Sequence, residues 1–164
     1  MRQTRLVVGV AGFVALLGML AAVRSDIASA QGDPHIGTWV LNVAKSKYTP
    51  GPPPKDQTSV YAAAGDGFKV STSGTGADGK PTMTGFSAMF DGKDHPVTGN
   101  PDWDAIMAKR VDSHTVEFTR KKGGKVVQTA TSAVSKDGRT RTVTTSGVNA
   151  QGQKINTVAV YDKK

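Results

Sequence analysis

Glycine turns recur at nearly regular intervals along this chain and divide it into short segments. The spacing is 12 to 14 residues within each of two runs, which are Gly67, Gly79 and Gly92, and then Gly124, Gly138 and Gly152. Asp-Gly and Gly-Gly pairs supply the positive φ angles that tight hairpin turns need. The segments between the turns are rich in Val, Thr, Phe and Tyr. This pattern is typical of consecutive strands joined by hairpins.

Ten strands are predicted between the turns. In the segment from Phe68 to Gly74, apolar and polar residues alternate, which indicates one buried and one solvent-facing side. The prolines within Lys45–Lys55 predict an irregular, polyproline-like connection, and Asp102–Asp112 offers a short helix as an alternative to a strand. The predicted strands are Gly37–Val43, Thr58–Ala64, Phe68–Gly74, Thr82–Phe90, Pro96–Thr98, Asp104–Val111, Thr115–Lys121, Lys125–Ser135, Arg139–Gly147 and Lys154–Tyr161.

The number of strands favours closure of the sheet. Open sheet edges expose unpaired backbone groups that invite aggregation, and an up-and-down barrel removes those edges. We therefore expect an all-β fold, an antiparallel up-and-down barrel of about 8–10 strands. Many expected inward positions carry Ala, Ser or Thr, and only 6% of the chain is aromatic. So few bulky side chains favour an internal cavity, although a flattened and filled barrel fits the same pattern.

The first 30 residues are typical of a secretory signal peptide. Two arginines precede an apolar run from Leu6 to Val23, and Ala28-Ser29-Ala30 supplies the small residues that signal peptidase prefers. We expect cleavage after Ala30, which makes residues 31–164 one β-barrel domain that is periplasmic or secreted. A retained membrane anchor is the alternative, because the apolar run approaches the length that spans a bilayer.

The expected mature chain is basic, and its charge is uneven. Without residues 1–30 it has 18 Lys and Arg against 12 Asp and Glu, a net charge of +6 with His neutral. Residues 101–164 carry all of this excess. Lys121, Lys122 and Lys125 could bind anionic glycan or lipid of the cell envelope, although a solubilising surface fits the same composition. No nucleic-acid-binding motif accompanies the charge, so nucleic acid is not an expected partner.

Residue types that carry chemistry are scarce. The chain has no cysteine, which excludes disulfides and thiolate ligands. His35, His95 and His114 lack the close spacing of a zinc site, and the aspartates between 91 and 104 suit turns better than a calcium loop. The sequence contains neither a Gly-x-Ser-x-Gly elbow nor a phosphate-binding glycine loop. We therefore expect a protein that is not an enzyme and that uses no metal or cofactor.

Several motifs resemble those of small β-barrel carriers. Gly37-Thr38-Trp39-Val40-Leu41 resembles the Gly-x-Trp opening of lipocalins and fatty-acid-binding proteins, and Val158–Lys163 resembles the last strand of the latter. Lys-Ser-Lys-Tyr and Pro-Gly-Pro-Pro-Pro are similar to motifs of small exported lipocalin-like proteins of bacteria. The resemblance implies a calycin-type barrel with Trp39 as a plug at the closed end. Two features differ: a proline-rich segment replaces the helical lid, and Ala159 replaces the arginine of the Arg-x-Tyr ligand motif that ends at Tyr161.

The candidate ligand-binding residues combine apolar groups with a few cations. Arg139 and Arg141 alternate on one predicted strand, and a guanidinium can grip a carboxylate or phosphate with two hydrogen bonds. If they face inward, they could replace the missing arginine or pack against Trp39, but an outward, solvated position is favoured. The expected function is binding or carrying a small, partly apolar ligand, hydrophobic or amphipathic and anionic. The candidates are Trp39, Phe68, Val70, Phe86, Val116, Phe118, Arg120, Arg139, Arg141 and Tyr161.

Overall fold

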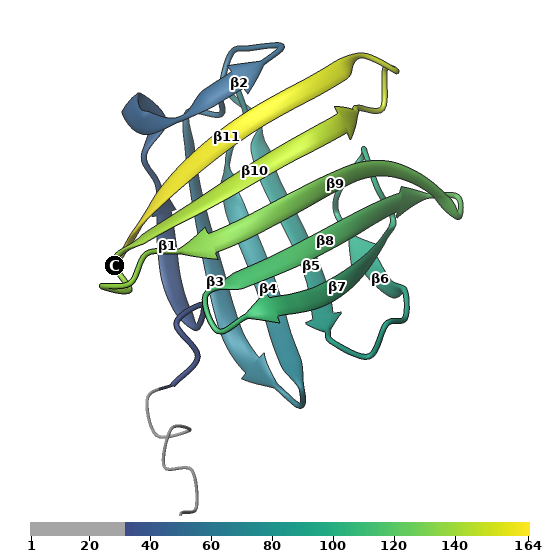
Figure 1. Ribbon diagram of the computed structural model, residues 1–164. Coiled ribbons are helices and arrows are strands. Elements are labelled where there is room, and N and C mark those ends of the chain that lie inside the picture. Colours follow the sequence, from purple (N-terminus) through teal and green to yellow (C-terminus); the bar gives the residue numbers. More distant parts are fainter. Residues whose placement is uncertain (1–31) are drawn as a thin grey trace, which may run out of the picture. The chain divides into compact units, whose positions relative to one another are not determined.

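The computed structural model describes residues 32–164, and the expected signal peptide, residues 1–30, lies outside them. The described residues form one antiparallel sheet that closes into a barrel (Figure 1). Ten strands follow one another around the ring in chain order, and β1 pairs with β11 to complete it. The expected all-β, up-and-down barrel is therefore confirmed.

The strands have the following bounds: β1 Gly37–Leu41, β2 Lys47–Thr49, β3 Asp56–Ala64, β4 Gly67–Thr75, β5 Pro81–Met89, β6 His95–Thr98, β7 Ala105–Asp112, β8 Thr115–Lys122, β9 Lys125–Val134, β10 Thr140–Val148 and β11 Lys154–Lys163. A short 3₁₀-helix, η2, spans Val43–Lys45. Each predicted strand corresponds to one strand of the ring, with ends that agree within two residues.

Two details of the connections differ from expectation. The alternative of a helix at Asp102–Asp112 is wrong, because β7 occupies most of that stretch. The connection at Lys45–Lys55 is not wholly irregular, because β2 within it pairs with β11 outside the ring. The residues of β2 precede the prolines and retain their backbone N–H groups, so they can still form a ladder.

Positive φ angles explain why glycine recurs at the turns. In the turn between β3 and β4, Gly65 has the positive φ, at +52°, and Gly67 does not. L-residues with a side chain rarely adopt such angles, so the glycine spacing determines where each strand ends. The other predicted turn glycines have φ between +70° and +82°, and these are Gly79, Gly92, Gly124, Gly138 and Gly152.

Gly147 is needed for space as well as for its backbone angle, because it lies within β10. Its φ is +142°, and an added Cβ would overlap the carbonyl oxygen of Val127 on β9. We expect Gly147→Ala to lower the free energy of unfolding by more than about 1 kcal/mol in urea denaturation. Gly138→Ala is the matched control, because φ is +70° there and no atom lies within 4 Å of an added Cβ. Equal losses in the two variants would contradict the steric explanation.

Part of the hydrophobic core packs at the end of the barrel where the N-terminal arm lies. Trp39 is fully buried there, and its indole nitrogen donates a 2.8 Å hydrogen bond to the carbonyl oxygen of His35. Phe68 and Val116 are at most 1% exposed beside it. We call this end, at which Trp39 is buried, the closed end.

His35 connects the N-terminal arm to this core. Its ring packs against Phe68 with centroids 5.5 Å apart, and its Nδ1 lies 3.2 Å from a carboxylate oxygen of Asp33. Asp33 is also ion-paired with Arg110 of β7. Burial lowers the pKa of His35 below its usual 6.5, and the nearby Asp33 opposes the shift only in part. The imidazole is therefore held neutral in the folded protein at neutral pH.

This lowered pKa predicts a loss of stability on acidification. Unfolded chains take up the proton on His35 near pH 6.5, whereas the folded protein does so only at lower pH. The contribution of this group is present above pH 6.5 and is lost as the pH falls through that value. We expect the free energy of unfolding, measured in urea at several pH values from about 7.5 to 5, to fall less steeply in His35→Gln than in the wild type. Parallel curves would contradict this role of His35.

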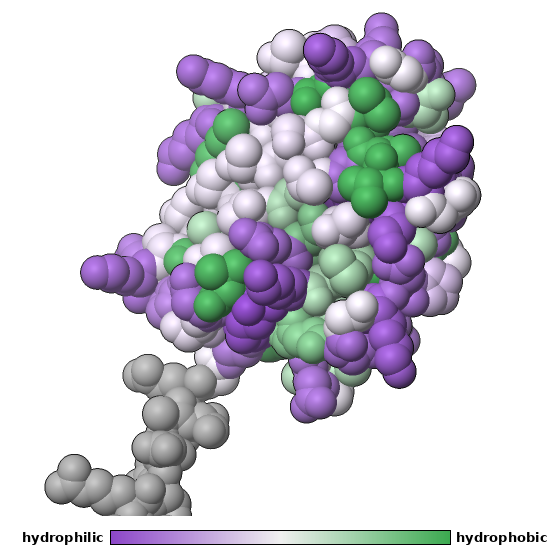
Figure 2. All heavy atoms as spheres, turned by 45° about the vertical axis from the view of Figure 1, so that its right-hand side comes forward, coloured by the Kyte–Doolittle hydropathy of each residue, from purple (hydrophilic) through white to green (hydrophobic). Residues whose placement is uncertain are grey.

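The outside of the barrel is of mixed polarity. Figure 2 shows hydrophilic side chains toward the border of one face and pale, weakly polar residues in its middle. Thr129, Thr131 and Thr144 are among the exposed residues of β9 and β10. Within residues 32–164, no helix has the length and apolar character needed to cross a membrane.

Candidate ligand-binding cavity

A cavity of about 370 Å³ lies inside the barrel. Its wall includes inward residues of β3, β4, β5, β8, β9, β10 and β11, and Tyr48, Pro50 and Pro54 of the proline-rich connection also line it. Successive side chains of a strand point to opposite faces, so each strand contributes every second residue. The volume falls in the range of about 300–1,000 Å³ that is typical of small-molecule sites.

Arg141 of β10 lies on this wall and is only 1% exposed. Its guanidinium carbon lies 4.3 Å from the ring centre of Tyr61, 4.5 Å from that of Tyr161 and 5.3 Å from that of Trp39. Its Nε and Nη1 atoms have no hydrogen-bond partner. Three aromatic faces thus stabilise the cation through their π-electrons, but its hydrogen-bonding capacity is left unused.

The position of Arg141 corrects one expectation. The favoured outward orientation is wrong for this residue, because the pleat of β10 turns Arg141, Val143 and Thr145 toward the interior. Arg141 takes the inward alternative, and its guanidinium carbon lies 5.3 Å from the ring centre of Trp39. Arg141 also lies directly opposite Tyr161 in the β10–β11 register. β11 carries Ala159 where the Arg-x-Tyr motif has arginine. The guanidinium of Arg141, on the neighbouring strand β10, lies beside Tyr161 instead.

Arg120 of β8 is the second cation of the cavity wall. Its Nη1 donates a 3.0 Å hydrogen bond to the side-chain oxygen of Gln128, and its guanidinium carbon lies 4.7 Å from the ring centre of Trp103. Its Nε is buried without a partner. Burial lowers the pKa of Arg120 from its usual value, and the nearby Asp102 contributes in the opposite direction. Arginine nevertheless stays protonated in proteins, so the cavity holds a second cation.

Tyr161 lies close to both cations. Burial raises the pKa of its hydroxyl, and the charges of Arg141 and Arg120 oppose that shift. The hydroxyl donates a 2.5 Å hydrogen bond to the side-chain oxygen of Gln57. Burial also raises the pKa of Tyr48, another residue of the cavity wall. Both phenols are therefore neutral at physiological pH. The single O–H of Tyr161 is already donated to Gln57, so the hydroxyl of Tyr48 is the phenolic donor that suits an anion.

The unsatisfied polar atoms concentrate on the two arginines. Within residues 32–164, four buried side-chain nitrogen or oxygen atoms lack a hydrogen-bond partner, and three of them belong to Arg120 and Arg141. No described Asp or Glu forms a salt bridge with either residue; the recorded ion pairs all involve other cations. A buried, unpaired charge is costly. A carboxylate or phosphate that enters the cavity would supply the missing acceptors.

The sequence candidates separate into three groups in the structure. Four of them line the cavity, namely Phe86, Arg120, Arg141 and Tyr161. Five are buried in the core and do not line this cavity, namely Trp39, Phe68, Val70, Val116 and Phe118. Arg139 is exposed in the turn before β10, so it lies outside the cavity although it alternates with Arg141.

Several residues of the wall escaped sequence analysis. Trp103 lies in the loop before β7, and its ring packs edge-on against Phe86 with centroids 5.6 Å apart. Gln128 is only 3% exposed and is held by a 3.1 Å hydrogen bond from its amide nitrogen to the carbonyl oxygen of Val148. A glutamine on a strand resembles a surface residue in a sequence. Only the period-two alternation with buried neighbours could have indicated its inward position.

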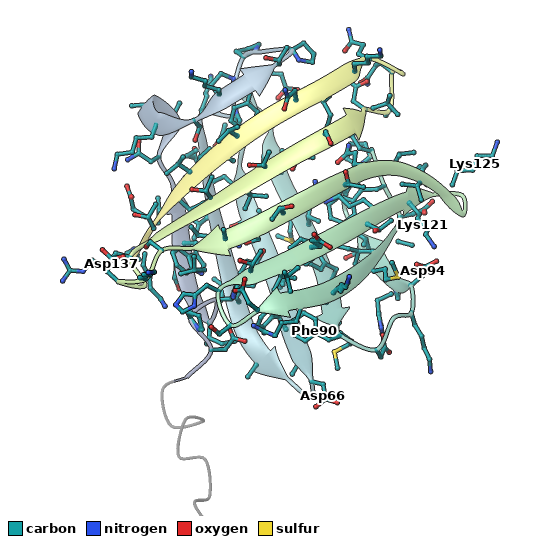
Figure 3. All side chains as sticks on the ribbon, viewed as in Figure 1. Asp66, Phe90, Asp94, Lys121, Lys125 and Asp137 are labelled. Atoms are coloured by element: carbon teal, nitrogen blue, oxygen red, sulfur yellow. The ribbon has the colours of Figure 1, made fainter. Side chains whose placement is uncertain are left out.

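A second hollow of about 470 Å³ lies at the closed end, beside Phe68, Phe90 and Arg110. Figure 3 labels Phe90 and the nearby Asp66 at this end. Arg110 is already ion-paired with Asp33, and its guanidinium lies 4.4 Å from the ring centre of Phe90. Because this cation has an internal partner, the hollow lacks the unsatisfied charge that distinguishes the barrel cavity.

Metal binding finds no support in the described part of the chain. Residues 32–164 contain no group of three or more His, Asp or Glu side chains close enough together to hold an ion. His95 instead forms a 3.0 Å contact with a carboxylate oxygen of Asp91 in a surface turn.

Neither a protein-family model nor a curated protein matches the sequence. Among solved structures, one that is similar is the zebrafish ileal bile acid-binding protein complexed with cholic acid, with a TM-score of 0.48. The sequences are 13% identical, and the alignment covers 80% of this chain and 99% of that chain. A likeness at this level carries no information about the ligand of the present chain.

Proposed function

We propose that this protein binds a small amphipathic anion inside its barrel and acts, after export, as a non-catalytic carrier or sequestering protein. The observation that carries the proposal is the fully buried guanidinium of Arg141, which has two nitrogens without a partner on the wall of a 370 Å³ cavity. The anionic group would lie beside Arg141 and Tyr161, within reach of Arg120. The less polar part of the ligand would contact Phe86 and neighbouring apolar residues of the wall.

The basic surface offers a weaker candidate site. Lys121 forms a 2.8 Å ion pair with Asp94, and Lys122 lies 4.0 Å from Asp104. Figure 3 shows Lys121 beside Asp94, whereas Lys125 extends away from the barrel. Two of the three lysines nominated for an anionic surface therefore have acidic neighbours. We accordingly favour the cavity over an envelope-binding surface.

The proposal is tested with 8-anilinonaphthalene-1-sulfonate, a fluorescent amphipathic anion. We expect one molecule to bind per chain and Arg120→Gln to weaken its affinity by about 10-fold, because a hydrogen bond to a charged group is worth about 1.5–3 kcal/mol. Arg139→Gln removes the same charge from the surface and is the matched control, with affinity unchanged. Equal affinities in wild type and Arg120→Gln would overturn the proposal.

Export is tested independently of binding. We expect protein recovered from the periplasm or the medium to begin at Gln31, because the small residues at 28 and 30 suit signal peptidase. Intact-mass measurement would reveal this end directly. Recovery of the full-length chain from the membrane fraction would favour a retained anchor instead.

A further inference from the structure

We infer that the anion is a hydroxyl-rich ring compound with a carboxylate, and not an alkyl-chain acid. The inference rests on the proposed function and names the chemical class of the ligand. Twelve of the 22 residues that line the cavity carry a hydroxyl or a side-chain amide. The other ten comprise the aliphatic Val143, Ile155 and Ala159, two prolines, Phe86 and Trp103, the two arginines, and one carboxylate, Asp102.

The hydroxyls are arranged in two rows across neighbouring strands. Ser59, Thr72 and Thr84 face one another in register across β3, β4 and β5, and the Ser59 and Thr72 hydroxyls are 3.0 Å apart. Thr145 and Thr157 form the second row across β10 and β11. All five residues line the cavity, and we call them the hydroxyl belt.

One row of the belt, Thr145 with Thr157, lies at a defined level relative to the cation. Along β10 and β11 the inward residues lie opposite one another in three successive pairs. The pairs are Arg141 with Tyr161, Val143 with Ala159, and Thr145 with Thr157. A carboxylate at Arg141 thus leaves the next part of the ligand beside small apolar side chains and the part after it beside hydroxyls. A ring with hydroxyls on its edge and a carboxylate at one position meets all three levels.

An alkyl chain fits this wall poorly. The Ser59 and Thr72 hydroxyls hydrogen-bond each other. The hydroxyls of Thr145 and Thr157 would lose their contact with water beside an alkyl chain and gain no hydrogen bond from it, which is unfavourable. The lining of a fatty-chain site would be dominated by aliphatic and aromatic side chains. Phe86 and Trp103 pack edge to face on the wall and can instead cover the apolar face of a ring.

Calorimetric titration of the full-length protein tests the inference with four probes. Galacturonate and quinate are ring carboxylates with several hydroxyls, galactose is a neutral ring polyol, and dodecanoate is an alkyl-chain acid. We expect at least one ring carboxylate to bind at least about 10-fold more tightly than galactose and dodecanoate, because only the ring carboxylates use both the cations and the belt.

Two variants then report on the belt itself. Thr145→Val removes an inward hydroxyl at nearly constant volume, and we expect it to weaken binding of the ring carboxylate by about 5-fold without weakening dodecanoate. Thr144→Val is the matched control, because Thr144 is exposed on the outer face of the same strand. Thermal unfolding of both variants verifies that they fold.

The outcomes separate the inference from the function on which it rests. Tighter binding of dodecanoate than of either ring carboxylate, lost in Arg120→Gln and unaffected by Thr145→Val, would overturn the inference and leave the anion-binding function intact. Failure of the carboxylates and of 8-anilinonaphthalene-1-sulfonate to bind would overturn the proposed function itself.

Discussion

Arg141→Met is expected to stabilise the protein and at the same time to weaken its binding of anions strongly. The free energy of unfolding should rise by on the order of 1 kcal/mol, because a buried cation without a carboxylate partner is replaced by an apolar side chain of similar length. Ligand affinity should fall by about 100-fold, because two charge-assisted hydrogen bonds are lost. Such opposite effects on stability and binding are typical of functional groups that are retained at a cost to the fold.

Urea denaturation and titration with 8-anilinonaphthalene-1-sulfonate measure the two effects in the same samples. Arg141→Lys keeps the charge and loses the planar guanidinium, so its affinity should be intermediate. Arg139→Met is the matched control on the surface, and neither quantity should change. A clear loss of stability in Arg141→Met would indicate that the guanidinium is a structural element of the core and not an unsatisfied ligand site.

Trp39→Ala is expected to cause the largest loss of stability of any single substitution considered. The side chain is fully buried, its nitrogen holds the carbonyl oxygen of His35, and the cationic nitrogen of Lys163 lies 4.9 Å from its ring centre. Removal of a buried large aromatic side chain costs about 3–5 kcal/mol. The N-terminal arm should also become more accessible to protease, because its anchor to the closed end is lost.

Two further variants separate the parts of this effect. Trp39→Phe retains most of the apolar contact and loses the hydrogen bond to His35, so its loss should be smaller, about 1–3 kcal/mol. Val40→Ala changes the next residue, which is 38% exposed on the outer face, and should cost less than about 1 kcal/mol. Similar losses for Trp39→Ala and Val40→Ala would contradict the role of Trp39 as the plug.

The barrel could be predicted from the sequence because its turns are marked by glycine. Positive φ angles at residues such as Gly79 and Gly138 require that residue type, so the ends of each hairpin are visible in the sequence. The short strand β2 was missed because its pairing with β11 depends on a contact between segments about a hundred residues apart.

The orientation of β10 could not be derived from its own sequence. Threonine occupies both faces of the strand, at Thr144 outside and at Thr145 inside, so alternation of polarity gives no sign of which face is buried. The expectation that Arg141 faces solvent followed from the usual cost of a buried charge. The structure offsets part of that cost with three aromatic rings, contributed by segments that the sequence does not bring together.

The wall of the cavity was the least predictable feature. The sequence pattern predicts large apolar residues such as Phe68 and Val116 as the lining, but these side chains are buried in the core and do not line the cavity. The actual wall is rich in Ser, Thr, Gln and Asn, residue types that are usually exposed. In a sequence, the residues of a polar cavity therefore cannot be told from surface residues. Ser59 and Thr145 lie in the same interior only because the barrel closes.

The central claim, that an anion binds between Arg120 and Arg141, is tested most directly by the side-chain Nε–H resonances of arginine in ¹⁵N-labelled protein. Spectra would be compared before and after saturation with 8-anilinonaphthalene-1-sulfonate, and the signals assigned with the single-arginine variants. We expect the signals of Arg120 and Arg141 to shift, since both Nε atoms lack a partner in the free protein, and those of Arg110 and Arg139 to remain in place. Binding of the probe without a shift at either cavity arginine would contradict the claim.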